Sequence, residues 1–317
     1  MSSKNLAVRN KKNINYFDLG AHLGTEIILF LWHINFLRNN DYLKNCSVNI
    51  YGFEPSPIIE LLKRRLKTIR YLYKGYPYPK KVESFNGVYS FKNSKKAAFN
   101  YLEHGPAPFL NIFNEQFNKE KTSLLDGDIE NINIYEKALT SLEGKFKLFL
   151  SERIEEYTTP ELGYGDLFNV EDIQPMDYLG STLFKSKVTG GIDKNIYKEV
   201  DGILLSRWIK ENIDNFKNSI NILKLNIEGS ESMVISDLIE SDMLKYFQII
   251  CGHDLLADVK KIPQLVESNK EFEKLIKDND IQSRFVYFCA SGEAHFLKDF
   301  GMMSERIEDE LIKRDWT

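Results

Sequence analysis

The stretch NINYFDLGAHLGTEIILFLW, residues 13–32, constrains the fold more than any other part of the sequence. An apolar run ends at Asp18, two glycines follow within six residues, and a long apolar helical pattern begins directly after them. A short apolar run that turns through glycine into a helix is typical of a buried strand in a parallel sheet. The stretch therefore predicts a strand over 13–19 and a helix over 25–39.

The alternation of strand and helix patterns continues along the chain. Strand patterns are found over 46–55, 131–141, 144–151, 219–231 and 246–254, helical patterns over 57–73 and 232–244, and a strand edge that runs into a helix over 200–213. Such alternation predicts an α/β fold with a mostly parallel sheet. The last apolar segments, 283–290 and 293–300, resemble an antiparallel pair, so we expect an antiparallel strand at one edge of the sheet.

Two irregular stretches interrupt this alternation. Residues 74–130, after the second strand and its helix, are rich in aromatics and lysines and are too long for an ordinary loop. We expect them to form an insertion that includes a helix over 107–119. Residues 152–200 are polar and rich in turn residues, and the segment from Gly163 to Gly180 is a candidate lid. The 317 residues fit a single domain with these two elaborations.

Composition argues against several classes of protein. Hydrophobic residues make up 43% of the chain, enough for a large core, and the net charge of −4 disfavours a general nucleic-acid binder. The longest apolar stretch, residues 27–37, is too short to span a bilayer. The three cysteines form no CxxC pair, and no apolar segment directly follows the basic first residues. We therefore expect a soluble, cytoplasmic protein.

The glycines after the first strand predict a ligand site. In open α/β sheets, ligands bind at the carboxyl ends of the strands, where the strand order reverses. Gly20 and Gly24 would let the backbone approach a ligand, and the following helix would offer free N–H groups. Asp18 would accept a hydrogen bond from a ligand amine or hydroxyl. The alternative is that both glycines only make a tight turn.

Two classes of nucleoside ligand compete for this site. A dinucleotide site requires GxGxxG, which the sequence GAHLG over residues 20–24 does not match, and a Walker lysine is absent. S-adenosylmethionine has no phosphate and is the better candidate. Glu54 and Pro55 end the second strand, and Glu54 is placed to hold both ribose hydroxyls. The alternative is that Glu54 is a surface cap.

Five sequence blocks, FDLGAHLGTE, VNIYGFEPSP, IYEKALTSLEGKFKL, GSTLFK and NILKLNIEGSESMVISDL, follow one another over most of residues 13–255. In these blocks the chain resembles the FkbM-type methyltransferases. The resemblance implies a class I methyltransferase fold, which is Rossmann-like, with S-adenosylmethionine as methyl donor. It also implies O-methylation, usually of hydroxyls on sugars or secondary metabolites.

The resemblance extends to individual residues. The implied cofactor-binding residues are Asp18, Gly20, Ala21, His22, Gly24, Glu54, Pro55 and Ala138. The candidates beside the reacting centre are Lys224, Asn226, Glu228, His253 and Asp254. Glu231 also belongs to the acidic end of that strand, where stabilising the N-terminus of the next helix is its expected role.

Two positions depart from the family's pattern. His22 stands where the family usually has Asn, and Asn226 stands where it usually has Asp. Because an amide cannot act as a general base, a role of that Asp in taking a proton or holding a metal would fall to Glu228, His253 or Asp254, or be lost. The ordinary pKa of histidine, near 6.5, suits His253 to the task, but a structural histidine is the alternative. Whether a metal is needed stays open.

The insertion offers a second set of candidate binding residues. Its tyrosines and lysines invite a glycan-binding interpretation, with packing onto the core as the alternative, and they are Tyr71, Tyr73, Tyr76, Tyr78, Lys80 and Lys81. His104 lies in the same insertion.

Three functions follow from the sequence. The first is an S-adenosylmethionine-dependent O-methyltransferase that acts on a hydroxyl of a sugar, a glycan or a related small molecule. The second is an oxidoreductase linked to NAD or a nucleotide sugar, which the missing GxGxxG weakens. The third is a non-catalytic, methyltransferase-like protein that binds a glycan or another partner. Asn226 keeps this third interpretation open.

Overall fold

The computed structural model describes residues 12–22, 46–60, 131–151, 180–187, 192–252, 262–287 and 305–316, with positions 24, 26, 27, 30, 34, 43, 62, 63 and 66. Several sequence predictions lie outside these residues. They are the insertion 74–130 with its helix, lysines and His104, the four tyrosines Tyr71 to Tyr78, the lid segment 163–179, His253, Asp254 and the segment 293–300.

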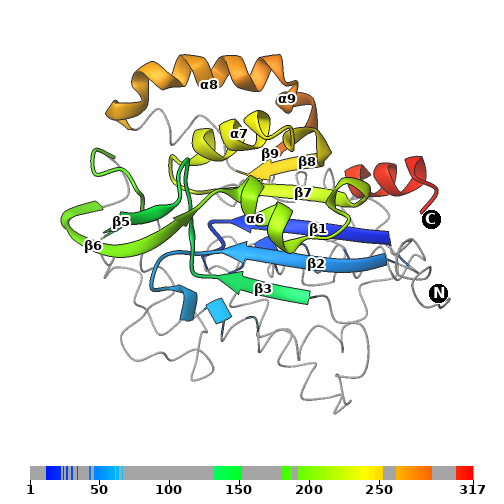
Figure 1. Cartoon of the computed structure of the whole chain (residues 1–317), viewed down its shortest axis with the longest axis horizontal. Coiled ribbons are helices and arrows are strands. Elements are labelled where there is room, and N and C mark those ends of the chain that lie inside the picture. Colours follow the sequence, from blue (N-terminus) through cyan, green and yellow to red (C-terminus); the bar gives the residue numbers. More distant parts are fainter. Residues whose placement is uncertain are drawn as a thin grey trace, which may run out of the picture.

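The centre of the fold is a six-stranded sheet in the order β3-β2-β1-β7-β8-β9 (Figure 1). Its strands are β1 (Lys12–Leu19), β2 (Cys46–Phe53), β3 (Asn131–Tyr135), β7 (Ile220–Leu225), β8 (Phe247–Gly252) and β9 (Phe285–Tyr287). Every described pairing in this sheet is parallel, and the strand order reverses between β1 and β7. The predicted α/β fold with a mostly parallel sheet is confirmed, and the order is consistent with a Rossmann-like fold.

The edge strand β9 runs parallel to β8. The chain between them passes through α8 (Val266–Asp278) and α9 (Ile281–Arg284), and a strand–helix–strand crossover returns the chain in the parallel direction. The segment expected to pair with β9 in the antiparallel direction lies outside the described residues, so the antiparallel edge strand stays a prediction.

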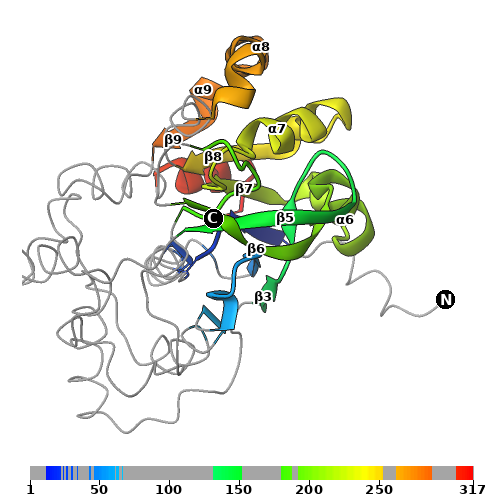
Figure 2. The same cartoon turned by 90° about the vertical axis from the view of Figure 1, so that its left-hand side faces the viewer.

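A second, three-stranded sheet stands at the carboxyl ends of the main strands. It contains β4 (Ala138–Leu139), β5 (Gly144–Ser151) and β6 (Ile192–Ile203) in the order β4-β6-β5, and β5 and β6 are antiparallel. In Figure 1 the arrowheads of β1, β2, β3 and β7 point to the side where β5 and β6 lie, and Figure 2 views the molecule from that side. The strand predicted over 131–141 is therefore two strands, β3 and β4, in different sheets. The end of the irregular stretch 152–200 is strand β6.

Helices cover both faces of the main sheet. On one face, α6 (Leu205–Asn212) and α7 (Glu231–Glu240) place Ile209 and Val234 in a buried cluster with Leu223 of β7. On the other face, a second buried hydrophobic cluster contains residues of β1 and β7. It also contains described helical positions between 26 and 66 and residues of a C-terminal helix over 305–313. The 3₁₀ helices among the described residues are Phe216–Asn218, Leu244–Tyr246 and Pro263–Leu265. Among the described residues, we find no helix with the length and apolar character needed to cross a membrane.

A ladder of asparagine side chains crosses four strands of the main sheet. Asn131, Asn49, Asn15 and Asn221 occupy equivalent register positions on β3, β2, β1 and β7. Each amide donates to the next side-chain carbonyl, over 3.1, 3.0 and 2.9 Å in turn. All four strands end four residues beyond their asparagine. Because a one-residue slip would break the ladder, it fixes the register and aligns the carboxyl ends of these strands.

Candidate functional site

An open hollow of about 600 Å³ lies where the carboxyl ends of β1, β2 and β7 meet the small sheet. This is the point where the strand order reverses, which is where open α/β sheets bind their ligands. The predicted site residues that line it are Gly20, His22, Glu54, Pro55, Ala138, Asn226 and Glu228. Asp18, Ala21, Gly24 and Lys224 lie outside the lining, and the remaining two candidates, His253 and Asp254, are not among the described residues.

Glu54 presents a fixed carboxylate to the hollow at the end of β2. Its Oε2 accepts a hydrogen bond from the backbone N–H of His22, and its Oε1 accepts one from the N–H of Ser56, both at 2.8 Å. The residue is 6% exposed, so the two bonds hold the carboxylate in one orientation. A carboxylate has about four acceptor positions, so two remain for a ligand hydroxyl. Glu54 thus makes capping contacts while it also lines the hollow.

The turn after β1 uses its N–H groups within the protein. The N–H groups of Gly20 and Ala21 both donate to the carbonyl of Phe53, at 3.0 and 3.1 Å, and that of Gly24 donates to Ala21 at 2.6 Å. The N–H of His22 donates to Glu54. The end of β2 thus supplies the acceptors of Gly20, Ala21 and His22, and Ala21 supplies that of Gly24. The free N–H groups expected of the following helix stay a prediction, because Thr25, where that helix was predicted to begin, lies outside the described residues. The described part of the turn has no donor left for a phosphate.

The two glycines make room for the protein chain itself. Gly20 has φ +77°, and a Cβ there would lie 1.9 Å from the carbonyl oxygen of Asn226. Gly24 has φ +68°, and a Cβ there would lie 2.7 Å from Leu62. The absence of side chains lets the β1 turn pack against the β7–α7 loop on one side and against the helix after β2 on the other.

Asp18 and Lys224 form a buried ion pair behind the turn. Their side chains are 0% and 2% exposed, and Lys224 Nζ lies 2.8 Å from Asp18 Oδ1. Nζ also donates to the carbonyl of Gly20 at 2.8 Å, and Glu26 lies 3.9 Å away. Burial raises the pKa of Asp18 to about 6 against the attraction of Lys224. Burial alone would lower the pKa of Lys224, but Asp18 and Glu26 outweigh it and hold that pKa above its ordinary value.

The position of this pair defines what Asp18 does in the structure. The carboxyl group ties β1 to β7 and supports the carbonyl of Gly20 through Lys224. It does not open into the hollow. Ala21 is fully buried in the same turn.

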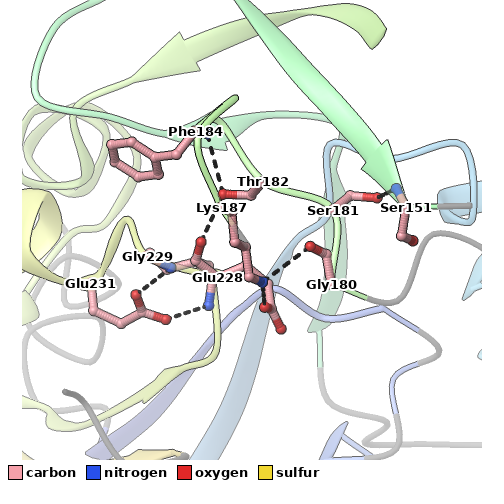
Figure 3. Close-up of polar contacts among 10 residues, drawn as sticks. Ser151, Gly180, Ser181, Thr182, Phe184, Lys187, Glu228, Gly229 and Glu231 are labelled. Atoms are coloured by element: carbon pink, nitrogen blue, oxygen red, sulfur yellow. Dashed lines mark hydrogen bonds and ion pairs between the residues drawn. The ribbon is translucent and has the colours of Figure 1, made fainter. Parts of the chain in front are cut away.

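The β7–α7 loop is shaped by two carboxylates (Figure 3). Glu231 accepts hydrogen bonds from the N–H groups of Ile227 and Gly229, both at 2.8 Å. Glu228 has φ +57°, a left-handed conformation that is uncommon outside glycine, and its carboxylate is ion-paired with Lys187. Glu231 therefore fixes the backbone of the loop through two N–H groups, and Lys187 fixes the side chain of Glu228.

Residues 180–183 line the hollow, and the sequence did not point to the roles of the segment 180–187 to which they belong. Thr182 Oγ1 donates to the carbonyl of Glu228 at 2.7 Å, and Lys187 Nζ donates to the carbonyl of Gly180 at 3.2 Å. Two backbone hydrogen bonds between Phe149 and Thr182, of 2.8 and 3.0 Å, attach the segment to β5. Its signal in the sequence was the block GSTLFK, residues 180–185, inside the irregular stretch 152–200.

Asn226 and Lys137 complete the polar lining. The backbone N–H of Asn226 donates to Leu19, and its side-chain amide makes no hydrogen bond within the described part of the chain. Lys137 lies 2.9 Å from Asp201 of β6. The described residues include no group of three or more His, Cys, Asp or Glu side chains placed to hold a metal ion.

Comparisons of the chain with protein-family models, with curated proteins and with solved structures gave no match.

Proposed function

We propose that this protein is an S-adenosylmethionine-dependent O-methyltransferase whose cofactor binds in the hollow. One combination of features carries the proposal. Glu54 presents a fixed carboxylate at the end of β2, while the described N–H groups of the β1 turn are all used inside the protein. A carboxylate suits ribose hydroxyls, and a turn without spare donors is a poor site for a pyrophosphate. S-adenosylmethionine has the ribose and lacks the phosphates.

The residues present fit this cofactor. Glu54 would hold the ribose, and the apolar surface around Phe53, Ala138 and Leu139 would receive the adenine. When bound, the cofactor would supply a methyl group already activated on a sulfonium. The chain would then orient the acceptor hydroxyl in line with that methyl and exclude water. Residues 180–183 also line the hollow and are the proposed acceptor side.

The acceptor hydroxyl must lose its proton during or after the attack. Asn226 cannot take a proton, and the carboxylate of Glu228 is already balanced by the ammonium of Lys187. We assign the proton to His253 or Asp254, which follow β8 directly in the sequence. Glu228 is then left to bind and orient the ligand.

The proposal is tested by calorimetric titration of the wild-type protein with S-adenosylhomocysteine and with NAD. We expect S-adenosylhomocysteine to bind and NAD not to bind. Glu54→Gln should weaken S-adenosylhomocysteine binding about tenfold or more, because it removes a charge-assisted acceptor. Glu60→Gln is the matched control, since Glu60 is exposed on the same connection and does not line the hollow.

Two results separate the alternatives. Binding of NAD without S-adenosylhomocysteine would contradict the proposal and favour the oxidoreductase. Tight binding of S-adenosylhomocysteine with no methyl transfer to hydroxylated acceptors would favour the non-catalytic protein. That alternative is considered because Asn226 replaces an expected carboxylate.

A further inference from the structure

One segment of the chain contacts Glu228 at two points. The ammonium of Lys187 pairs with the Glu228 carboxylate, and the hydroxyl of Thr182 donates to the Glu228 carbonyl at 2.7 Å (Figure 3). The segment is itself attached to β5, through Phe149 and through a 3.2 Å hydrogen bond from the N–H of Ser151 to Ser181 Oγ. The conformation of Glu228 is thus fixed from outside its own loop.

Glu228 is an unusual residue for the conformation that it adopts. Its φ of +57° is common for glycine and tolerated by Asn and Asp but rare for Glu, and such outliers gather at functional sites where the surroundings enforce them. Lys187 has a side chain that is 2% exposed, whereas the Glu228 side chain is 20% exposed and lines the hollow. A buried ammonium requires a counter-charge, so the pair restrains the loop while the carboxylate stays at the surface of the hollow.

The position of this loop along the sheet indicates which part of a ligand it would meet. Neighbouring strands lie about 4.8 Å apart, so the ends of β2 and β7, with β1 between them, are separated by about 10 Å. If the nucleoside part of a ligand is held at Glu54, the rest of the ligand would extend toward β1. Its far end would then lie at residues 226–229, which present the side-chain amide of Asn226 and the carboxylate of Glu228 to the hollow.

We propose that Lys187 is a positioning residue that acts through Glu228 to hold the loop 226–229 against the ligand beyond its nucleoside. The inference rests on the proposed function and names the chemistry of this end of the ligand. An amide and a carboxylate side by side suit a zwitterionic amino acid, with the Glu228 carboxylate facing the ammonium and the Asn226 amide donating to the carboxylate. Lys187 itself does not line the hollow, so it would act on the ligand only through Glu228.

The test compares two ligands on the same variants. S-adenosylhomocysteine carries the amino-acid end and adenosine lacks it, and both are titrated into wild type, Lys187→Met and Lys187→Arg. We expect Lys187→Met to weaken S-adenosylhomocysteine binding about tenfold and adenosine binding less than about twofold, since only one end of the ligand loses its contacts. Lys187→Arg keeps the charge and should restore most of the affinity. Lys185→Met, at an exposed position of the same segment, should change neither affinity.

A purely structural role of Lys187 would lower both affinities together, or only the melting temperature. If Lys187→Met does not fold, Lys187→Gln, which removes the charge but keeps a polar group for the Gly180 carbonyl, is titrated in its place. The same selective loss is expected of it. Equal losses for the two ligands, or no loss, would overturn this inference alone. A wild-type protein that binds neither ligand would overturn the proposed function and this inference with it.

Discussion

Replacing Asn15 by alanine tests whether the asparagine ladder holds the sheet, and with it the hollow, in register. Asn15 is 1% exposed, donates to Asn221 Oδ1 at 2.9 Å and accepts from Asn49 Nδ2 at 3.0 Å. Each lost hydrogen bond removes about 1 kcal/mol. The oxygen of Asn221, which is fully buried, is also left without its side-chain donor, which costs about 1 kcal/mol more. We therefore expect Asn15→Ala to lower the free energy of unfolding by about 3 kcal/mol.

The other end of the ladder supplies the control. Asn131 is exposed and makes a single ladder bond, to Asn49 at 3.1 Å, so water can replace what Asn131→Ala removes. We expect a loss of less than about 1 kcal/mol for this variant. Urea denaturation followed by circular dichroism measures both variants, and an unchanged m-value makes the midpoints comparable. Equal losses at Asn15 and Asn131 would refute the argument that burial sets the cost along the ladder.

Two further predictions concern the buried pair of Asp18 and Lys224. Lys224→Met leaves the Asp18 carboxylate, 0% exposed, without its cation, so urea denaturation at pH 8 should show a loss of about 3–5 kcal/mol. The double variant with Asp18→Asn should recover most of it, and a double variant as unstable as the single one would contradict the pairing. Folded-state burial raises the pKa of Asp18 to about 6, so its contribution to stability is complete below pH 3.8 and lost as pH rises through 6. Without Lys224 that pKa rises further, so the deficit of Lys224→Met should shrink as pH falls from 8 to 6. A stability deficit of Lys224→Met that does not change with pH would contradict the raised pKa of Asp18.

Much of the fold could be predicted from the sequence because its signals are local. The apolar runs that end at Asp18, Glu54 and Leu225 are each followed by turn residues and a helical pattern, and this alternation is typical of a parallel sheet. Glu54 could be placed at the hollow because its position at a strand end depends only on the length of that strand.

The remaining features depend on which strands become neighbours. Asp18 and Lys224 are far apart in the sequence and meet only because β1 and β7 pair in register. The donors of the β1 turn find their acceptors at Phe53 and Glu54, on the adjacent strand. Likewise, Lys187 reaches Glu228 from a segment flanked by irregular sequence. Local patterns carry no information on such contacts, so the acceptors of the turn and the role of Lys187 were missed.

A crystal structure of the protein with S-adenosylhomocysteine tests the central claim most directly. The account predicts the ribose of the ligand on the Glu54 carboxylate and its amino-acid end beside residues 226–229. Ligand density away from the ends of β1, β2 and β7, or a nucleotide with its phosphates seated on the β1 turn, would contradict it.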